Sequence, residues 1–289
     1  MRTAKLTVKF LKTASLIILI CGPLLVRAQN APLQNGFAHN DYWHKRPLFD
    51  ALDNGYTHIE ADIFYINGEM VVAHFFPFFQ GKRTLENLYL KPLAERVKKQ
   101  GNIFEGYDTP ITLMIDIKTG ADDTYRALKP LLNKYSSILS SYENGKVHQR
   151  QVTIVLSGNK PYRSIKNERQ RLAFIDEDLR DVGKDKCNAN VYQMASCKYS
   201  SLLNWDGNGN MPEKERKRLC SYVTKAHSMG KKVRLWASPE KESVWKQLLN
   251  CGVDLINTDE LTTLRKFLVN NTLVHEKINL AGKPRVASL

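Results

Sequence analysis

The sequence predicts an α/β fold and, within that class, a closed (β/α)8 barrel. Eight short runs rich in β-branched and aromatic residues alternate with longer runs that have helical periodicity. Strands that alternate with helices favour a parallel sheet, because each parallel crossover needs a long connection. Residues 29–289 are close to the roughly 250 that one such barrel usually takes, so we expect a single domain there.

The strands are predicted from apolar runs bounded by Gly, Asn or Asp. The pair Asn67-Gly68 predicts a tight hairpin, so the run after it is an added strand outside the set of eight. The barrel strands are expected at 36–40, 57–64, 112–118, 152–158, 172–178, 191–196, 233–238 and 254–260, with the hairpin strand at 69–74.

The helices are predicted from amphipathic runs between these strands, several of which end at a glycine. Residues 270–289 show no clear period and are expected to form a polar tail. The expected helices are 46–55, 91–101, 122–142, 211–230 and 238–252.

The first 28 residues have the pattern of a secretory signal peptide. Four basic residues precede the apolar run 14–26, and the small residue Ala28 follows at the expected cleavage position. Gly22 and Pro23 interrupt the run, which is short for a membrane span. We therefore expect a cleaved signal peptide at 1–28 and a secreted or periplasmic protein.

The charge predicts an anionic partner. The chain has a formal net charge of +14, and without its first 28 residues 38 basic and 29 acidic residues leave +9. Such a balance suits phosphorylated small molecules or phospholipid surfaces, so peripheral membrane contact is part of the expectation. No nucleic-acid partner is expected, because no DNA- or RNA-binding motif is present and many basic residues alternate with acids, as in 212–218.

Four cysteines follow the signal segment, at positions 187, 197, 220 and 251. None belongs to a Cys-x-x-Cys pair, so a zinc ribbon is not supported. In an exported protein Cys187 and Cys197 are the nearest candidates for a disulfide, and the alternative is that all four are free and buried.

The stretch HIEADIFYINGEMVVAH, residues 58–74, carries the first chemical signal. Glu60 and Asp62 point to the same side of a strand, where two carboxylates repel each other unless they share a cation. Asp116 lies on the next barrel strand and, like them, near the rim where barrel enzymes place their catalytic residues. Three carboxylates make a hard-oxygen site, which predicts Mg²⁺ or Ca²⁺.

Further polar residues fall at the same rim. His39 and Asn40 end the first strand, His74 ends the hairpin strand, and Lys118 shares a strand face with Asp116. Two histidines suit acid–base chemistry near neutral pH, and Lys118 adds a positive charge for an anion. Trp236 lies near the end of the seventh strand. Together with a cation, this set predicts phosphoryl chemistry.

These motifs resemble the phospholipase C-like phosphodiesterase superfamily, which includes glycerophosphodiester phosphodiesterases and sphingomyelinase D-type enzymes. The resemblance rests on His39, the E-x-D of Glu60 and Asp62, His74, the Asp116-x-Lys118 pair and GVDLINTDE near the end. AHNDYWHKRPLFDALDNGYTHIEADIF and RTLENLYLKPL resemble more closely the branch named in fungi for altered inheritance of mitochondria.

The resemblance implies a phospholipase C-like (β/α)8 barrel with a divalent cation on Glu60, Asp62 and Asp116. It implies His39 and His74 as the acid–base pair, with Lys118 and Asn40 on the substrate phosphate side and Trp236 lining the substrate site. Two positions depart from the glycerophosphodiesterase pattern. Asn40-Asp41 stands where Arg-Gly is typical, and Phe75-Phe76 follows the second histidine where Asp is typical.

The resulting hypothesis is an exported, metal-dependent phosphoric diester hydrolase acting on a glycerophosphodiester or a phospholipid headgroup. A metal-independent phosphatidylinositol phospholipase C is the second hypothesis, although the complete acidic trio speaks against it. A non-catalytic binder of phosphorylated ligands is the third. The aromatic run after His74 predicts either a lipid-facing rim or ordinary packing at the barrel mouth.

Overall fold

The computed structural model describes residues 31–77, 81–184 and 190–281, with side chains of the last helix up to residue 272. The predicted signal peptide, residues 1–28, lies outside the described residues. Within the described ranges, each helix is too short or too polar to cross a lipid bilayer.

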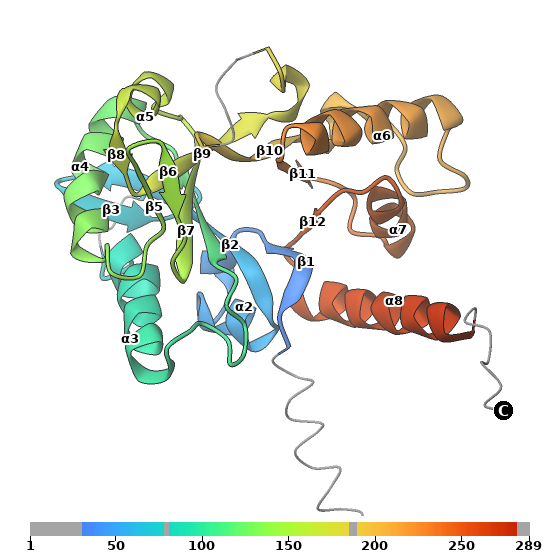
Figure 1. Cartoon of the computed structure of the whole chain (residues 1–289), viewed down its shortest axis with the longest axis horizontal. Helices are drawn as coiled ribbons and strands as arrows, with labels where there is room; N and C mark the ends of the chain where they lie inside the picture. The colour runs from blue at the N-terminus through green and yellow to red at the C-terminus, as the bar shows by residue number, and fades with distance from the viewer. Residues whose placement is uncertain (1–30, 78–80, 185–189, 282–289) are drawn as a thin grey trace, which may run out of the picture.

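Eight parallel strands close into a barrel, as the sequence predicts (Figure 1). The barrel closes because β1 pairs with β12 along one edge and with β2 along the other. In chain order the barrel strands are β1 Leu33–Ala38, β2 Tyr56–Ile66, β4 Ile111–Ile117, β7 Val152–Gly158, β9 Ala173–Asp178, β10 Tyr192–Lys198, β11 Lys232–Trp236 and β12 Leu255–Thr258.

One added strand extends the barrel wall, also as predicted. β3 (Glu69–Val72) pairs antiparallel with the end of β2 through a turn at Asn67 and Gly68. Both turn residues have positive φ, 49° and 85°, which is the conformation that Asn-Gly hairpins need. The hairpin carries the chain outward and back to the barrel rim, where Ala73 N donates to Asp62 O at 3.2 Å.

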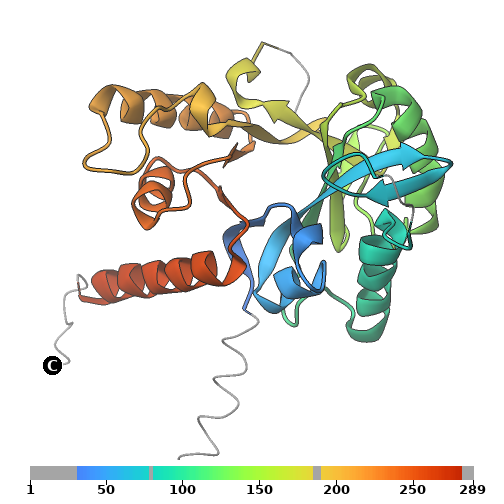
Figure 2. The same cartoon turned by 180° about the vertical axis from the view of Figure 1, so that it is seen from behind.

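Helices surround the barrel, and Figures 1 and 2 show α3 and α4 on one side of it and α6 and α7 on the other. The last helix, α8, extends away from the barrel. The helices are α2 Phe49–Asp53, α3 Lys91–Gln100, α4 Ala121–Lys134, α5 Tyr162–Asn167, α6 Glu213–Ser228, α7 Glu242–Asn250 and α8 Leu261–Ala281. Single helical turns occupy Asp41–Trp43, Glu86–Leu90, Leu179–Asp181 and Tyr199–Ser201.

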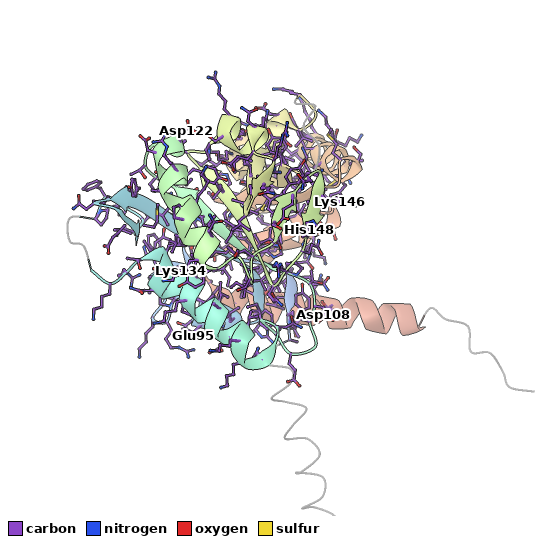
Figure 3. All side chains as sticks on the ribbon, turned by 60° about the vertical axis from the view of Figure 1, so that its left-hand side comes forward. Glu95, Asp108, Asp122, Lys134, Lys146 and His148 are labelled. Atoms are coloured by element: carbon purple, nitrogen blue, oxygen red, sulfur yellow. A yellow bond between two sulfur atoms is a disulfide. The ribbon has the colours of Figure 1, made fainter. Side chains whose placement is uncertain are left out.

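The helix predicted at 122–142 is too long. α4 ends at Lys134, and Ser140 N then donates to Val152 O at 2.8 Å, so the chain turns to join the start of β7. The next residues begin a small sheet of β5 (Ser141–Glu143), β6 (Lys146–His148) and β8 (Gln170–Arg171). Figure 3 shows this sheet near α4, with Lys146 and His148 labelled on β6.

The polar tail predicted at 270–289 is wrong for residues 270–281, which continue α8. The helix is anchored at its start, where Leu261, Leu264 and Leu268 are buried. No glycine or proline interrupts it before Gly282, so helical propensity favours its extension beyond the anchored part.

The cysteines pair differently from both sequence-based alternatives. Cys220 on α6 and Cys251 directly after α7 form a disulfide, with Cα atoms 4.7 Å apart. Cys197 is free and buried on β10, so the predicted Cys187–Cys197 bond is absent, and Cys187 itself lies outside the described residues. The pairing depends on the middle of α6 and the end of α7, which are neighbours in space but 31 positions apart in sequence.

The barrel interior contains an apolar layer and, toward the carboxyl ends of the strands, a polar layer. The apolar layer is a cluster separate from the main core, formed by Phe37, Met114, Val155, Phe174, Met194 and Leu255. A polar side chain lies two residues after each of these apolar residues and therefore points to the same face of its strand or strand end. These polar residues are His39, Asp116, Ser157, Asp176, Ser196 and Asn257.

Candidate active site

The polar layer forms the floor of a cavity of about 680 Å³ at the carboxyl ends of the strands. This is where (β/α)8 barrels place their ligands. All eight site residues proposed from the sequence line it: His39, Asn40, Glu60, Asp62, His74, Asp116, Lys118 and Trp236. The strands therefore bring together residues that are spread over nearly 200 positions of sequence.

The three carboxylates lie together on neighbouring strands. Asp62 on β2 and Asp116 on β4 are direct partners in the sheet register, and Glu60 precedes Asp62 on the same face of β2. One oxygen from each of Glu60, Asp62 and Asp116 lies within 4.8 Å of the others. Lys118 Nζ lies 2.8 Å from both Asp62 Oδ2 and Asp116 Oδ1, so a positive charge already bridges two of the three.

Glu60 is a buried carboxylate, 4% exposed. Burial raises its pKa, although the charges of Arg234 and His39 act in the opposite direction. Arg234 Nη1 lies 3.3 Å from Glu60 Oε2 and 3.2 Å from Asn257 Oδ1. The guanidinium also lies 4.1 Å from the ring centre of Phe37, so it joins the polar layer to the apolar layer below.

Asp116 is held by two features of β7. Ser157 Oγ donates to Asp116 Oδ2 at 2.9 Å. Gly158 has a φ of 66°, and a Cβ added there would lie 2.6 Å from Asp116 Oδ1. Glycine is therefore required at this position both by its backbone conformation and by the close approach of the carboxylate.

The acidic trio fits a hard divalent cation. Its donors are three carboxylates that converge on one point from two rigid strands, and oxygen donors of this kind are what Mg²⁺ and Ca²⁺ prefer. Asp116 and Asp62 also hold the pKa of Lys118 above its usual value, although burial lowers it. A cation would compete with the Lys118 ammonium for the same two carboxylates.

His39 is oriented from behind by a carboxylate. Its Nδ1 lies 2.8 Å from Asp259 Oδ1, and its Nε2 lies 3.8 Å from Glu60 Oε2. Burial lowers the pKa of His39, but the hydrogen bond to Asp259 and the charges of Glu60 and Asp259 outweigh this, so the pKa is raised overall. With the Nδ1 proton directed to Asp259, Nε2 is the nitrogen that faces the carboxylates.

His74 is oriented by contacts with Asp62 and Tyr42. Its Nδ1 lies 3.2 Å from Asp62 Oδ2 and 3.0 Å from the Tyr42 hydroxyl. The same hydroxyl lies 2.7 Å from Asn40 Oδ1 and 2.8 Å from Asp62 Oδ2. Tyr42 is thus in hydrogen-bond contact with one candidate cation ligand, one candidate catalytic histidine and Asn40, whose amide in turn lies 3.0 Å from His39 Nδ1.

Aromatic rings surround His74 at the cavity mouth. The ring of Trp43 lies 4.8 Å from that of His74, and the ring of Phe75 lies 4.6 Å from it on an edge-to-face contact. Trp43, Phe75 and Phe76 are 57%, 76% and 56% exposed, which is unusual for such large apolar side chains.

Several cavity residues were not identified from the sequence. Tyr42 was missed because its hydroxyl reaches the site from a helical turn and not from a strand end. Ser157, Asp176 and Ser196 each lie two residues beyond an apolar residue of the inner layer, and Lys160 lies just after β7, so the spacing of the strands could have identified these four. Lys198 and Arg234 also line the cavity but do not follow this spacing.

The family of the chain follows from comparison with known proteins. Residues 28–176, more than half of the chain, match the model of the AIM6-like phosphodiesterase domain. The chain belongs to this family. A second match, to the glycerophosphoryl diester phosphodiesterase family, covers residues 232–262 of this AIM6-like chain, which include β11 and β12.

Curated relatives of this AIM6-like domain carry the name altered inheritance of mitochondria protein 6. The protein from Lachancea thermotolerans is 28% identical over 275 residues, covering 78% of this chain and 63% of that protein. The protein from Eremothecium gossypii is 28% identical over 268 residues, covering 80% and 68%. The chain thus spans just under two thirds of the length of the Lachancea relative.

A solved structure of similar fold is titled a calcium-dependent phosphoinositol-specific phospholipase C from a Gram-negative bacterium, Pseudomonas sp.. It has a TM-score of 0.51 and 14% identity, covering 81% of this chain and 92% of that chain. At this identity the similarity concerns the fold alone. It confirms the predicted phospholipase C-like barrel for this AIM6-like chain.

Proposed function

We propose that this AIM6-like domain is a metal-dependent phosphoric diester hydrolase that cleaves a glycerophosphodiester or a phospholipid headgroup. The observation that carries the proposal is that the two candidate histidines, the acidic trio and Lys118 line a single cavity. The family match supports a phosphodiesterase. A divalent cation held by Glu60, Asp62 and Asp116 would neutralise the non-bridging oxygens of the phosphate.

The chain's own residues would then divide the proton transfers. Lys118 holds a phosphate oxygen by charge, and Asn40 offers an amide beside His39. One of His39 and His74 accepts the proton of the attacking hydroxyl as its oxygen forms the new P–O bond. The other donates a proton to the leaving oxygen as the old P–O bond breaks, so charge and atoms balance.

The first test is product release from a panel of phosphodiesters by the purified protein. The panel contains glycerophosphodiesters, lysophospholipids, sphingomyelin, phosphatidylinositol and a chromogenic diester, each with Mg²⁺, with Ca²⁺ and with chelator. Turnover that disappears with chelator supports the proposal. Turnover that survives chelator favours the metal-independent phospholipase, for which the Lys118 bridge between Asp62 and Asp116 is the specific structural support.

The histidine roles are tested by single substitutions. His39→Ala and His74→Ala should each lower turnover at least about a hundredfold, the usual contribution of a positioned acid or base. His148→Ala is the matched control, because His148 is exposed on β6 and does not line the cavity. Wild-type turnover in either cavity variant would refute the assignment, and ligand binding without turnover in the native protein would favour the non-catalytic binder.

The cation site is tested by Asp62→Asn. Loss of this ligand should weaken cation affinity and turnover together, each by about tenfold or more. Calorimetric titration with Ca²⁺ and with Mg²⁺ measures the affinity directly. Asp123→Asn, a change of an exposed aspartate on α4, is the control. Unchanged affinity in Asp62→Asn would mean that the cation binds elsewhere.

Export through the predicted signal peptide belongs to the same proposal. The Cys220–Cys251 disulfide supports it, because such bonds persist mainly in oxidising compartments outside the cytosol. N-terminal sequencing of the protein recovered from the cell exterior or the periplasm should begin at Gln29. A chain that starts at its initiating methionine would refute the proposed cleavage.

The exposed aromatic rim supports peripheral contact with a lipid surface. Trp43, Phe75 and Phe76 offer a wedge of aromatic surface beside His74. Lys82 and Arg83, exposed at the return of the loop after β3, add positive charge for an anionic bilayer.

Sedimentation with phosphatidylserine-containing vesicles tests this contact. Phe76→Ser should reduce the bound fraction, whereas Val269→Ser, which removes an exposed apolar side chain on α8, should not. Equal binding of the two variants would refute the rim as the contact surface.

A further inference from the structure

The cavity extends well beyond the acidic trio. From Glu60 and Asp116 it continues across the ends of β7, β9 and β10, where Lys160, Asp176 and Lys198 line it. A volume of about 680 Å³ lies in the middle of the range for ligand sites and exceeds what a bare phosphodiester needs. The part of the cavity beyond the trio is therefore the place for the rest of the substrate.

Five cationic side chains line this cavity, and three of them are neutralised by carboxylates. Lys118 bridges Asp62 and Asp116, and Arg234 contacts Glu60. Arg180 makes a two-bonded ion pair with Asp178, one bond of 2.9 Å and one of 2.5 Å. Each of these three cations therefore has a carboxylate in direct contact.

The remaining two cations, Lys160 and Lys198, have no carboxylate at ion-pair distance among the described residues. Lys160 Nζ donates to the backbone carbonyl of Asp176 at 2.8 Å, which orients the ammonium, and the carboxylates of Asp176 and Asp178 interact with its charge without forming a direct ion pair. Lys198 Nζ lies 5.8 Å from the ring centre of Trp236, its direct partner in the β10–β11 register. Both ammonium groups therefore remain able to bind an anion.

The two lysines flank a single strand of the barrel wall. Lys160 follows β7 and Lys198 ends β10, and β9 lies between those two strands in the barrel. The carboxylate of Asp176 on β9 is buried and accepts a hydrogen bond from Ser196 at 2.8 Å, so it is engaged within the wall. A cationic headgroup placed here would meet two ammonium groups and be repelled.

We propose that the substrate carries a second anionic group, a phosphate monoester or a carboxylate, which Lys160 and Lys198 bind at the far side of the cavity from the acidic trio. This inference rests on the proposed function, since it places the scissile phosphate at the trio. The inferred substrate is a phosphodiester with an anionic headgroup, and not one with a choline or ethanolamine headgroup.

Two matched ligand pairs isolate the second anion. Glycerophosphoserine differs from glycerophosphoethanolamine by one carboxylate, and glycerophosphoinositol 4-phosphate differs from glycerophosphoinositol by one phosphate. Calorimetry on the His39→Ala protein measures affinity without turnover. We expect the anionic member to bind about tenfold more tightly in at least one pair, and the ratio to fall as salt is added. The better pair distinguishes a carboxylate from a phosphate.

The lysines are tested in the same background. Lys160→Gln and Lys198→Gln should each reduce the affinity ratio by about threefold to fivefold, the effect of one partly exposed ion pair. Lys214→Gln on α6 is the control and should leave the ratio unchanged, because Lys214 is exposed outside the cavity. Ratios near one in both pairs, or ratios that survive both cavity substitutions, would overturn the inference.

The panel of diesters separates this inference from the proposed function. Turnover without any preference for the anionic members would refute the second-anion site and leave the hydrolase intact. A clear affinity ratio that depends on both lysines, with no turnover of any diester, would refute the hydrolase and leave an anion-binding cavity.

Discussion

The residues that follow His39 along the chain determine how both histidines are placed. Asn40 adopts the left-handed conformation, with a φ of 46°, which turns the chain sharply after β1. Asp41 is fully buried and accepts hydrogen bonds from Leu48 N at 2.5 Å and from the Tyr89 hydroxyl at 2.9 Å. This anchor fixes the turn from which Tyr42 reaches Asp62 and His74.

Burial raises the pKa of Asp41 to about 6, although its hydrogen bonds from Leu48 and Tyr89 oppose the shift. The folded protein therefore holds this proton more tightly than the unfolded chain, whose aspartates titrate near 3.9. The resulting stabilisation is complete below the unfolded pKa and is lost as the pH rises through about 6. A shift of about two units corresponds to about 3 kcal/mol.

Asp41→Asn tests this linkage, because asparagine does not ionise. Between about pH 4 and about pH 7, the unfolding free energy of the wild type should fall by about 3 kcal/mol relative to that of the variant. Urea unfolding at several pH values measures the difference. Parallel pH profiles for the two proteins would show that Asp41 does not titrate in this range.

At the scale of elements, the residues at the strand ends determine the geometry of the candidate site, and β7 is the clearest example. Gly158 ends this strand with positive φ and lies against Asp116 on β4. Strand β7 thus shapes a candidate cation ligand on its neighbour without contributing a ligand itself.

Gly158→Ala should lower both stability and cation affinity, because the new Cβ would displace the Asp116 carboxylate. Gly106→Ala is a matched control, since Gly106 has a similar φ of 69° and open space around it. Both variants lose about 1 kcal/mol to backbone strain. Gly158→Ala should lose about 1–3 kcal/mol more, together with at least about tenfold in Ca²⁺ affinity. Equal effects in urea unfolding and calorimetry would contradict the contact argument.

The elements also show what sequence could and could not predict. The eight strands are predictable because short apolar runs bounded by Gly, Asn or Asp identify buried strands, and a polar residue at the end of such a run marks the rim where barrels place their ligands. This logic placed Glu60, Asp62 and Asp116 in one cavity. It missed Tyr42 and Arg234, whose roles depend on side chains that reach across the barrel over distances no local pattern encodes.

The ends of the helices and the small sheet of β5, β6 and β8 are harder to predict from the sequence, because they also depend on tertiary contacts. Helical periodicity continued through 135–142, but the pairing of Ser140 with Val152 is a tertiary contact that overrides local propensity. The sequence of the second half of α8 has a weak amphipathic pattern, so the signal that locates most helices is missing there.

At the scale of the whole molecule, the disulfide joins the middle of α6 to the residue after α7, and β11 lies between these two helices in the chain. The closed segment of 31 residues contains Arg234 and Trp236, so the bond restrains the part of the chain that supplies one wall of the cavity. A loop of this length contributes about 3–4 kcal/mol to stability in the chain-entropy description.

Removal of the bond by Cys220→Ser together with Cys251→Ser should lower the unfolding free energy by about 3 kcal/mol. A reducing agent should have the same effect on the wild type and none on the double variant, which makes the variant its own control. Chemical unfolding with and without reductant measures both. A wild type insensitive to reductant under unfolding conditions would show that the bond is not formed.

The hairpin of β2 and β3 places the two histidines on different parts of the molecule. His39 follows a strand of the closed barrel, whereas His74 follows β3, which pairs only with the end of β2 in the main sheet. Insertions, deletions or exchanges between residues 66 and 84 would therefore move one of the two proposed catalytic histidines, together with the aromatic side chains beside it, while the barrel and its carboxylates stay in place. A change of this hairpin could thus alter the proposed substrate range without changes to the barrel.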